Sequence, residues 1–182
     1  METYIILLRG INVGGKNKVP MATLKACLEE LGFAGVTTYI ASGNVILQSD
    51  KTSAEIEALI EEALPGHFEL DSALIRILAL PLPKLRAIVA GKPAGFGEQP
   101  ELYHSDAIFL IGITASDAMP VFNPREGVDK VWPGDGVIYS QRLSTERTKS
   151  RLGAIVGTPP YASMTIRSWN TVTKLLALAG SR

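Results

Sequence analysis

The residues best suited to do chemistry gather near the N-terminus, where glycine, asparagine and lysine follow a short apolar run. The sequence Gly10-x-x-x-x-Gly15-Lys16 matches the start of a phosphate-binding P-loop. Asn17, however, stands where a P-loop has the serine or threonine whose hydroxyl binds magnesium. Pro20 biases the residue before it away from helix, whereas a P-loop continues directly into a helix. The segment therefore does not predict a nucleotide-hydrolysing site.

The same segment can still bind an anion. Glycines leave backbone N–H groups accessible, and successive N–H groups beside basic side chains form a nest for an anion. We expect the side chain of Arg9 to be held in place, because Arg9 directly follows the apolar run. The alternative is a flexible glycine loop with surface lysines. The predicted anion ligands in this segment are Arg9, Asn12, Gly14, Gly15, Lys16 and Lys18.

A second group of polar residues is Ser42-Gly43-Asn44, which lies between two predicted strands. A Gly-Asn pair is typical of a hairpin turn, and that alone would explain it. In a strand–helix–strand–strand–helix–strand fold, the first strand ends at the same edge of the sheet as this turn. We therefore predict that Ser42 and Asn44 lie beside the Arg9–Lys18 segment and add to the anion site. His67 is expected at this edge too, although the sequence supplies no partner to orient its ring.

The third group opens the last predicted helix, at Thr165-Ile166-Arg167-Ser168-Trp169-Asn170-Thr171. A helix N-terminus beside an arginine can bind an anion, so Arg167, Asn170 and Thr171 are predicted as a separate contribution. The alternative is that Ser168 or Asn170 only caps the helix. Trp169 is interpreted as a core residue, because a single aromatic residue is weak support for base stacking. The sequence leaves open whether this group meets the first one.

Other reactive residues have structural explanations. Cys27 lies in an apolar helical stripe and is predicted to be buried. His104 and Asp106 have no metal-ligand or triad partner in the sequence, and aspartates near turns are expected there. One cysteine excludes an intramolecular disulfide and a cysteine-based zinc cluster. We therefore predict no metal and no cofactor, and we leave open whether the protein is an enzyme.

Hydrophobic spacing and turn residues predict the elements that must position these groups. In the first half we expect strands at 4–8, 36–41, 45–48 and 70–78, and helices over 21–31 and from 52 to a stop at 65–66. The second of these helices begins with the capping box Thr52-x-x-Glu55. A linking helix is expected around 82–89.

The second half repeats this pattern less clearly. Strands are predicted at 107–113, 129–132, 137–141 and 163–167, and helices at 116–122, 148–156 and 171–179. Both halves then have the order of a β-α-β-β-α-β unit. We therefore predict an α+β protein of two ferredoxin-like subdomains with antiparallel sheets. The predicted boundaries are 1–79, a linking helix and loop at 80–104, and 105–182.

The composition agrees with a globular protein. The chain has 182 residues, of which 46% are hydrophobic and 20% charged, and its formal net charge is zero. Zero net charge gives no overall attraction to nucleic acid or membranes, although residues 139–182 are mainly basic and 50–70 mainly acidic. No apolar run approaches the roughly 18 residues of a membrane span, and the N-terminus does not resemble a signal peptide. We expect a cytoplasmic protein that does not bind membranes.

Three segments together resemble one known family. They are Leu8-Arg9-Gly10-Ile11-Asn12-Val13-Gly14-Gly15, Tyr39-x-x-Ser42-Gly43-Asn44-Val45 and Arg167-x-Trp169-Asn170-Thr171-Val172. They resemble the signatures of a bacterial family catalogued as domain of unknown function sixteen ninety-seven, in the same order and over nearly the whole chain. The resemblance implies an α+β protein of two ferredoxin-like subdomains. It implies no activity.

Three functions remain open. The leading hypothesis is a protein that binds a phosphorylated small molecule, such as a nucleotide, or a short single-stranded nucleic acid through the glycine-rich basic segment. A first alternative is an enzyme acting on a small phosphorylated or carboxylated substrate, with Arg9 and Lys16 stabilising charge. A second alternative is a protein-interaction module or self-association through the acidic and basic segments. The oligomeric state stays open.

Overall fold

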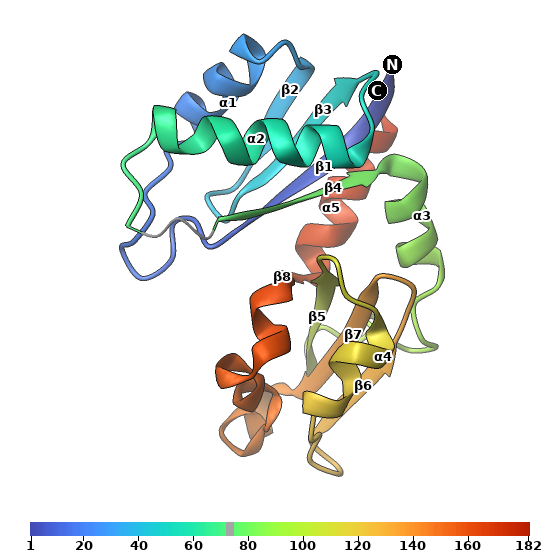
Figure 1. Cartoon of the computed structure of the whole chain (residues 1–182). Coiled ribbons are helices and arrows are strands. Elements are labelled where there is room, and N and C mark those ends of the chain that lie inside the picture. Colours follow the sequence, from blue (N-terminus) through green and yellow to red (C-terminus); the bar gives the residue numbers. More distant parts are fainter. Residues whose placement is uncertain (72–74) are drawn as a thin grey trace. The chain divides into compact units, whose positions relative to one another are not determined.

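The computed structural model describes residues 1–71 and 75–182, and these form two compact units. The first unit comprises Met1–Arg86 and Leu175–Arg182, and the second comprises Ala87–Lys174. Each unit contains a four-stranded antiparallel sheet with helices, so the predicted α+β architecture with two antiparallel sheets is confirmed (Figure 1). The predicted linking helix is α3 (Leu82–Ala90), which begins in the first unit and ends in the second.

The first unit has the element order β-α-β-β-α-β. Its elements are β1 (Glu2–Arg9), α1 (Met21–Glu30), β2 (Ala34–Tyr39), β3 (Asn44–Ser49), α2 (Ser53–His67) and β4 (Arg76–Pro81). The strands lie in the order β2-β3-β1-β4, and every neighbouring pair is antiparallel. The predicted strand at 70–78 lies partly outside the described residues, since 72–74 are not among them, and β4 begins at Arg76.

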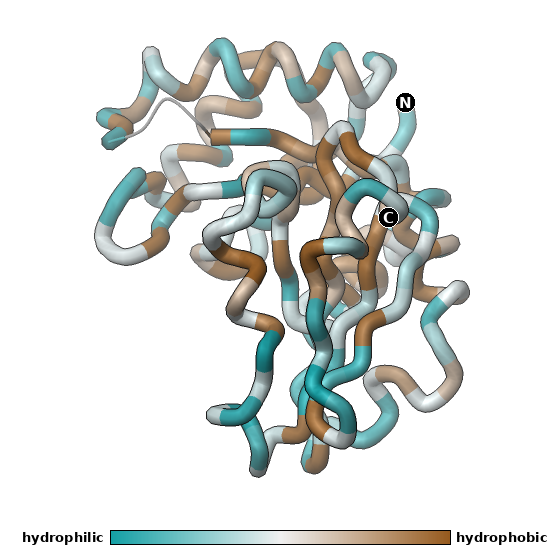
Figure 2. The backbone as a smooth tube through the Cα atoms, turned by 60° about the horizontal axis from the view of Figure 1, so that its bottom comes forward, coloured by the Kyte–Doolittle hydropathy of each residue, from teal (hydrophilic) through white to brown (hydrophobic). Residues whose placement is uncertain are grey.

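Both long helices of this unit cover the same face of its sheet (Figure 1). Alternate residues of β1, namely Tyr4, Ile6 and Leu8, are buried in one cluster with apolar residues of α1 and α2. Hydrophobic and hydrophilic residues alternate along the turns of α2 (Figure 2), as expected for a helix with one buried stripe. This packing fixes the ends of the strands, from which the loops of the candidate site emerge.

The ends of α2 show one confirmed prediction and one wrong one. The capping box is confirmed, because the Thr52 hydroxyl accepts from Glu55 N–H at 3.4 Å and the Glu55 carboxylate accepts from Thr52 N–H at 2.8 Å. The predicted stop at Pro65 is wrong, since α2 continues to His67. Pro65 lacks an N–H and its ring crowds the carbonyl four residues earlier, but only two further helical residues follow it, so the helix tolerates it near its end. The next turn still closes, because Phe68 N–H donates to Leu64 O at 3.0 Å.

Charged side chains cover both edges of the first sheet. On the edge strand β4, Glu61 accepts from Ile77 N–H at 3.0 Å and Glu57 accepts from Ala79 N–H at 2.9 Å. On the edge strand β2, the Arg182 guanidinium donates to the Gly35 carbonyl and to the Thr37 hydroxyl. Edge strands with open N–H and C=O groups pair readily with other chains. These contacts therefore oppose strand pairing with a second molecule.

The second unit has the same relative strand order with different connections. Its elements are β5 (Tyr103–Leu110), α4 (Ala115–Ala118), η1 (Met119–Val121), β6 (Asp129–Pro133), β7 (Val137–Leu143), η2 (Ser144–Lys149), η3 (Leu152–Gly157), η4 (Pro159–Ser163), β8 (Met164–Ser168) and α5 (Trp169–Gly180). The strand order is β6-β7-β5-β8, again antiparallel throughout. The last residues of α5 and the two residues that follow it, Leu175–Arg182, belong to the first unit, where Arg182 is bonded.

The predicted helix at 148–156 is wrong, because this stretch forms parts of two separate 3-10 segments, η2 and η3. The buried carboxylate of Asp129 accepts from the Ser150 hydroxyl at 2.6 Å and from Arg151 N–H at 2.9 Å. The backbone at Ser150 is extended, which separates η2 from η3. A tertiary contact thus overrides the helical pattern of the local sequence.

The two faces of the second sheet bury different side chains. One face packs an aliphatic cluster that includes Ile108, Ile138 and Met164. The other carries an aromatic cluster in which Phe96 meets Trp132, Tyr139 and Trp169 edge-on, with ring centroids 5.9, 5.4 and 5.0 Å away. Trp169 is buried, which confirms its prediction as a core residue.

Candidate functional site

The glycine-rich segment forms a small ordered hairpin. Lys16 N–H donates to Val13 O at 3.0 Å, and Asn12 N–H donates to Asn17 O at 3.0 Å. Gly14 and Gly15 occupy the two central turn positions with φ of 59° and 75°. A two-residue turn with positive φ at both positions suits glycine, because side chains are strained there. The glycine pair is thus explained by a tight turn, and the segment is neither a P-loop nor an unstructured loop.

Two asparagine side chains brace this hairpin. The Asn12 side chain accepts from Val19 N–H at 2.8 Å and donates to the carbonyls of Val19 at 2.9 Å and Ala41 at 2.8 Å. The Asn17 amide donates to Gly10 O at 2.9 Å. The bond to Ala41 confirms that the hairpin lies beside the turn between β2 and β3. We call residues 10–19 and 40–43 together the loop pair.

The loop pair concentrates unusual backbone conformations. Among the described residues, positive φ at a residue other than glycine occurs at Asn12, Asn17 and Ile40, with values of 54°, 48° and 49°. All three positions belong to the loop pair. A β-branched residue such as Ile40 rarely adopts this conformation. Strain of about 1–3 kcal/mol per residue persists only where the surroundings enforce it, and it clusters at functional sites.

The charge around the loop pair is mixed. Lys16 and Lys18 are exposed and form no ion pair within the described residues. Arg9 lies directly opposite Arg76 in the register of β1 and β4. Asp71 accepts from Asn17 N–H at 2.6 Å, so the hairpin already binds one carboxylate. An open cavity of 460 Å³ is lined here by Gly15, Lys18, Pro20, Glu69, Leu70 and Asp71.

The predicted site residues of the first unit fall into two groups. Asn12 and Asn44 hold the loops together; Asn44 is fully buried and its amide donates to Tyr39 O at 3.0 Å and the Ser42 hydroxyl at 2.9 Å. Gly14, Gly15, Lys16, Lys18 and Ser42 are exposed. His67 is the last residue of α2, where its ring packs on Phe68.

The third predicted group lies in the second unit, at the junction of β8 and α5. Arg167 is buried and donates to the Thr165 hydroxyl and to Ile166 O, both at 2.9 Å. Burial lowers the pKa of Arg167 to about 10. Ser168 caps α5, because its hydroxyl accepts from Thr171 N–H at 3.3 Å and pairs with the Thr171 hydroxyl at 2.9 Å. The anion role of Arg167, Asn170 and Thr171 stays a prediction, and the burial of Arg167 and Thr171 favours a structural role.

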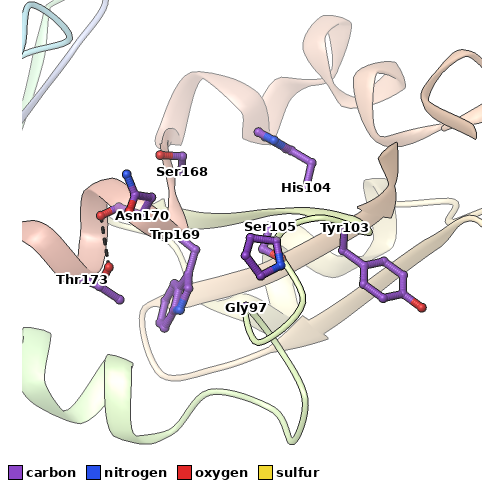
Figure 3. A pocket seen from close by; sticks show the side chains of 9 residues that line it. Gly97, Tyr103, His104, Ser105, Ser168, Trp169, Asn170 and Thr173 are labelled. Carbon is purple, nitrogen blue, oxygen red and sulfur yellow. Dashed lines mark hydrogen bonds between the residues drawn. The ribbon is translucent and has the colours of Figure 1, made fainter. Parts of the chain in front are cut away.

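Sequence reasoning missed a cavity of 310 Å³ beside this junction (Figure 3). Its lining includes His104 and Ser105 of β5 and Ser168, Trp169, Asn170 and Thr173 from the end of β8 and the start of α5. The His104 ring nitrogen Nε2 lies 3.1 Å and 3.0 Å from the two carboxylate oxygens of Asp106. The spacing of two along a strand places both side chains on one face, which was the available signal. The predicted strand began at residue 107, whereas β5 begins at Tyr103, so the prediction left His104 and Asp106 outside the sheet.

Polar residues occupy half of this face of the second sheet. Arg142 lies opposite His104, while Ser140 and Ser168 lie on either side of Asp106 in register. The Arg142 Nε is buried without a hydrogen-bond partner in the described part of the chain. Burial raises the pKa of Asp106, and the charges of His104 and Arg142 partly oppose that rise. The same face is aliphatic further along the strands, at Ile108 and Ile138.

Within residues 1–71 and 75–182, no group of three or more His, Cys, Asp or Glu side chains could hold a metal ion. No helix in these ranges is long and apolar enough to cross a membrane.

Residues 1–139 match the family described as "Protein of unknown function (DUF1697)". The chain belongs to the DUF1697 family. It is similar to the solved structure of conserved bacterial protein SP0830 from Streptococcus pneumoniae, with 27% identity, a TM-score of 0.81 and 98% of each chain covered. No curated protein matches the chain. The DUF1697 match includes the loop pair and the His104–Asp106 pair, whereas Arg167 lies beyond the matched residues.

Proposed function

We propose that the loop pair of this DUF1697 protein binds a phosphate group, carried by a small phosphorylated molecule or by a short single-stranded nucleic acid. The observation that carries the proposal is the braced loop pair, which contains all described non-glycine residues of positive φ and the exposed side chains of Lys16 and Lys18. A loop that is ordered before binding avoids the entropy cost of ordering. The loop pair has no histidine, cysteine or carboxylate of its own, which favours binding over catalysis there.

The electrostatics support an anionic ligand. The N–H groups of Gly14 and Gly15 donate to no acceptor within the described residues, so a phosphate could accept from them. The carboxylate of Asp71 already uses the N–H of Asn17 in this way. Asp71 would also compete with a ligand anion through its charge.

The finer fold and the location belong to the same proposal. We place both units in the ferredoxin-like class, supported by their common strand order β2-β3-β1-β4 and β6-β7-β5-β8. We place the protein in the cytoplasm, where phosphorylated metabolites and nucleic acids are made.

The test is calorimetric titration with inorganic phosphate, AMP, ATP and a ten-nucleotide oligothymidylate. Lys16→Ala/Lys18→Ala should weaken binding at least tenfold. Asp71→Asn should tighten binding about three- to tenfold, because it removes the repulsion between the Asp71 carboxylate and the bound anion. Two unit charges 4 Å apart in water repel by roughly 1 kcal/mol. The asparagine keeps an acceptor for Asn17 N–H. Lys25→Ala/Lys51→Ala removes the same charge from exposed positions elsewhere in the unit and should change little.

The results separate the ligand classes. A nucleic-acid ligand gives a steep salt dependence that grows with the number of phosphates contacted, whereas a mononucleotide gives a shallow one. Equal losses in both lysine pairs, or no binding by any probe, would overturn the proposal.

A further inference from the structure

We propose that His104, oriented by Asp106, is the general base of a second site in the second unit, where it activates water for attack on a small neutral ester. The site is the 310 Å³ cavity at the start of α5. This site shares no residue with the loop pair. The proposal therefore goes beyond phosphate binding, and the two proposals are tested independently.

The histidine–carboxylate geometry gives the ring a defined orientation. Asp106 lies behind His104, with its side chain 17% exposed against 44% for His104. The Nε2 atom faces both carboxylate oxygens at 3.0–3.1 Å, so in the neutral ring it carries the hydrogen and donates it to Asp106. The other nitrogen, Nδ1, then has the lone pair that accepts a proton. An oriented neutral imidazole is the usual general base at physiological pH.

The polar side chains around His104 and Asp106 favour a chemical role for this pair over a role in core packing. A largely buried carboxylate is costly unless it is paired. Here Asp106 faces His104 on its own strand, Ser140 and Ser168 on the adjacent strands, and the charge of Arg142 nearby. The adjoining half of the same face shows that this sheet can pack with aliphatic residues alone. The fold therefore does not require the polar cluster.

The cavity indicates the class of substrate. Its described lining consists of His104 and of glycine, proline, aromatic, hydroxyl and amide residues. None of these described lining residues is Lys, Arg, Asp or Glu, so an uncharged substrate fits. Figure 3 shows His104 and Ser168 on one side of β5 and Ser105 and Trp169 on the other. The volume is at the lower end of the range for ligand pockets, about 300–1,000 Å³.

Water is the nucleophile in this scheme, because the Ser168 hydroxyl is engaged in capping α5. His104 Nδ1 takes a proton from the water, and the water oxygen forms a bond to the acyl carbon. The acyl C–O bond then breaks, its electron pair leaves with the alkoxide, and the alkoxide takes the proton back from His104. The products are the acid and the alcohol. Thr171 N–H already donates to Ser168, so the N–H groups of Trp169 and Asn170 at the start of α5 are the ones proposed to stabilise the developing oxyanion.

Hydrolysis of para-nitrophenyl acetate tests the base directly. The chain has two histidines, so His67→Gln is a matched control for His104→Gln. We expect His104→Gln to lose about 100-fold in kcat/KM, within the usual range for a general base, and His67→Gln to keep the wild-type rate. Equal effects of the two variants, or a wild-type rate no higher than that of free imidazole at equal concentration, would overturn the proposal.

The positioning role of Asp106 is tested by the ring tautomer. Nitrogen NMR of the two histidines should show the Nε2–H form at His104 in the wild type and a mixture in Asp106→Asn, with His67 unchanged. The same variant should lower kcat with KM little affected. Thr173→Phe is a second variant, which fills the cavity from the exposed face of α5 and should abolish turnover while keeping the His104 tautomer. An unchanged tautomer in Asp106→Asn, or full activity of Thr173→Phe, contradicts the assignment.

Discussion

The two units share one strand order but place their polar groups differently. In the first unit, the polar side chains of the proposed phosphate site lie in loops beyond the strand ends. Charged side chains form hydrogen bonds with both edge strands of its sheet. In the second unit, polar side chains occupy half of one sheet face. Two sheets with the same relative strand order thus place their polar side chains in different positions. This difference predicts that changes at the second site affect stability more than changes at the first.

The largest loss of stability is expected from a change in the aromatic cluster of the second unit. Phe96→Ala removes a fully buried ring with three edge-on aromatic neighbours and should lower the free energy of unfolding by about 3–5 kcal/mol. Both tryptophans of the chain lie in this cluster, so tryptophan fluorescence in urea follows the second unit. Phe33→Ala, in the core of the first unit, is the control. If Phe33→Ala shifts the fluorescence midpoint equally, the two units unfold together and the contrast between them fails.

A smaller effect is expected from the brace of the loop pair. Asn12→Ala removes three side-chain hydrogen bonds and should cost about 2 kcal/mol, since each bond contributes about 0.5–1.5 kcal/mol. Urea unfolding followed by far-UV circular dichroism measures the loss. The exposed Asn123 of the second unit serves as control, and Asn123→Ala should stay within about 0.5 kcal/mol of wild type. A neutral Asn12→Ala would show that the hairpin does not depend on its brace.

Features that depend on neighbouring residues could be predicted from the sequence. The capping box of Thr52 and Glu55 needs only four consecutive residues, and the β2–β3 turn was predicted from the adjacent pair Gly43-Asn44 between two short strands. The closeness of the Arg9–Lys18 segment to the β2–β3 turn followed from topology. The binding roles of these residues stay predictions.

Predictions from the sequence were wrong or incomplete where residues far apart in the chain determine the local structure. The carboxylate of Asp129 bonds residues 150 and 151 and so interrupts a stretch with a helical pattern. The partners of Asp106 come from β7 and β8, far along the chain, so its setting could not be read locally. Asn12 was predicted to bind an anion, and its side-chain hydrogen bonds hold the loops together.

The smallest expected effect concerns the guarded edge of β4. Burial raises the pKa of Glu57 above its ordinary value, against the opposing hydrogen bond from Ala79 N–H. A raised pKa in the folded state means that this group contributes stability at low pH and loses it as pH rises through the folded pKa. Glu57→Gln keeps the acceptor and removes the charge. Its stability relative to wild type should therefore be higher at pH 7 than at pH 4, as measured by urea unfolding.

Glu55 on the same helix gives a control of opposite sign. The hydrogen bonds from Thr52 lower the pKa of Glu55, so its contribution is present at neutral pH and is lost as pH falls. Glu55→Gln should therefore be less stable than wild type at pH 7 and approach it at low pH. If both variants change with pH in the same direction, the edge contact of Glu57 does not set its titration.

The hydrogen bonds between Arg182 and the edge strand β2 have a consequence for biosynthesis. Arg182, which bonds the open edge of β2, is made after every other described residue of both units. Residues 1–86 leave the ribosome on the order of ten seconds earlier, at about 5–20 residues per second. During that interval the nascent first sheet has its β2 edge unprotected. Neighbouring chains on one messenger RNA could then pair through this strand, and a chaperone that shields it would act in this window.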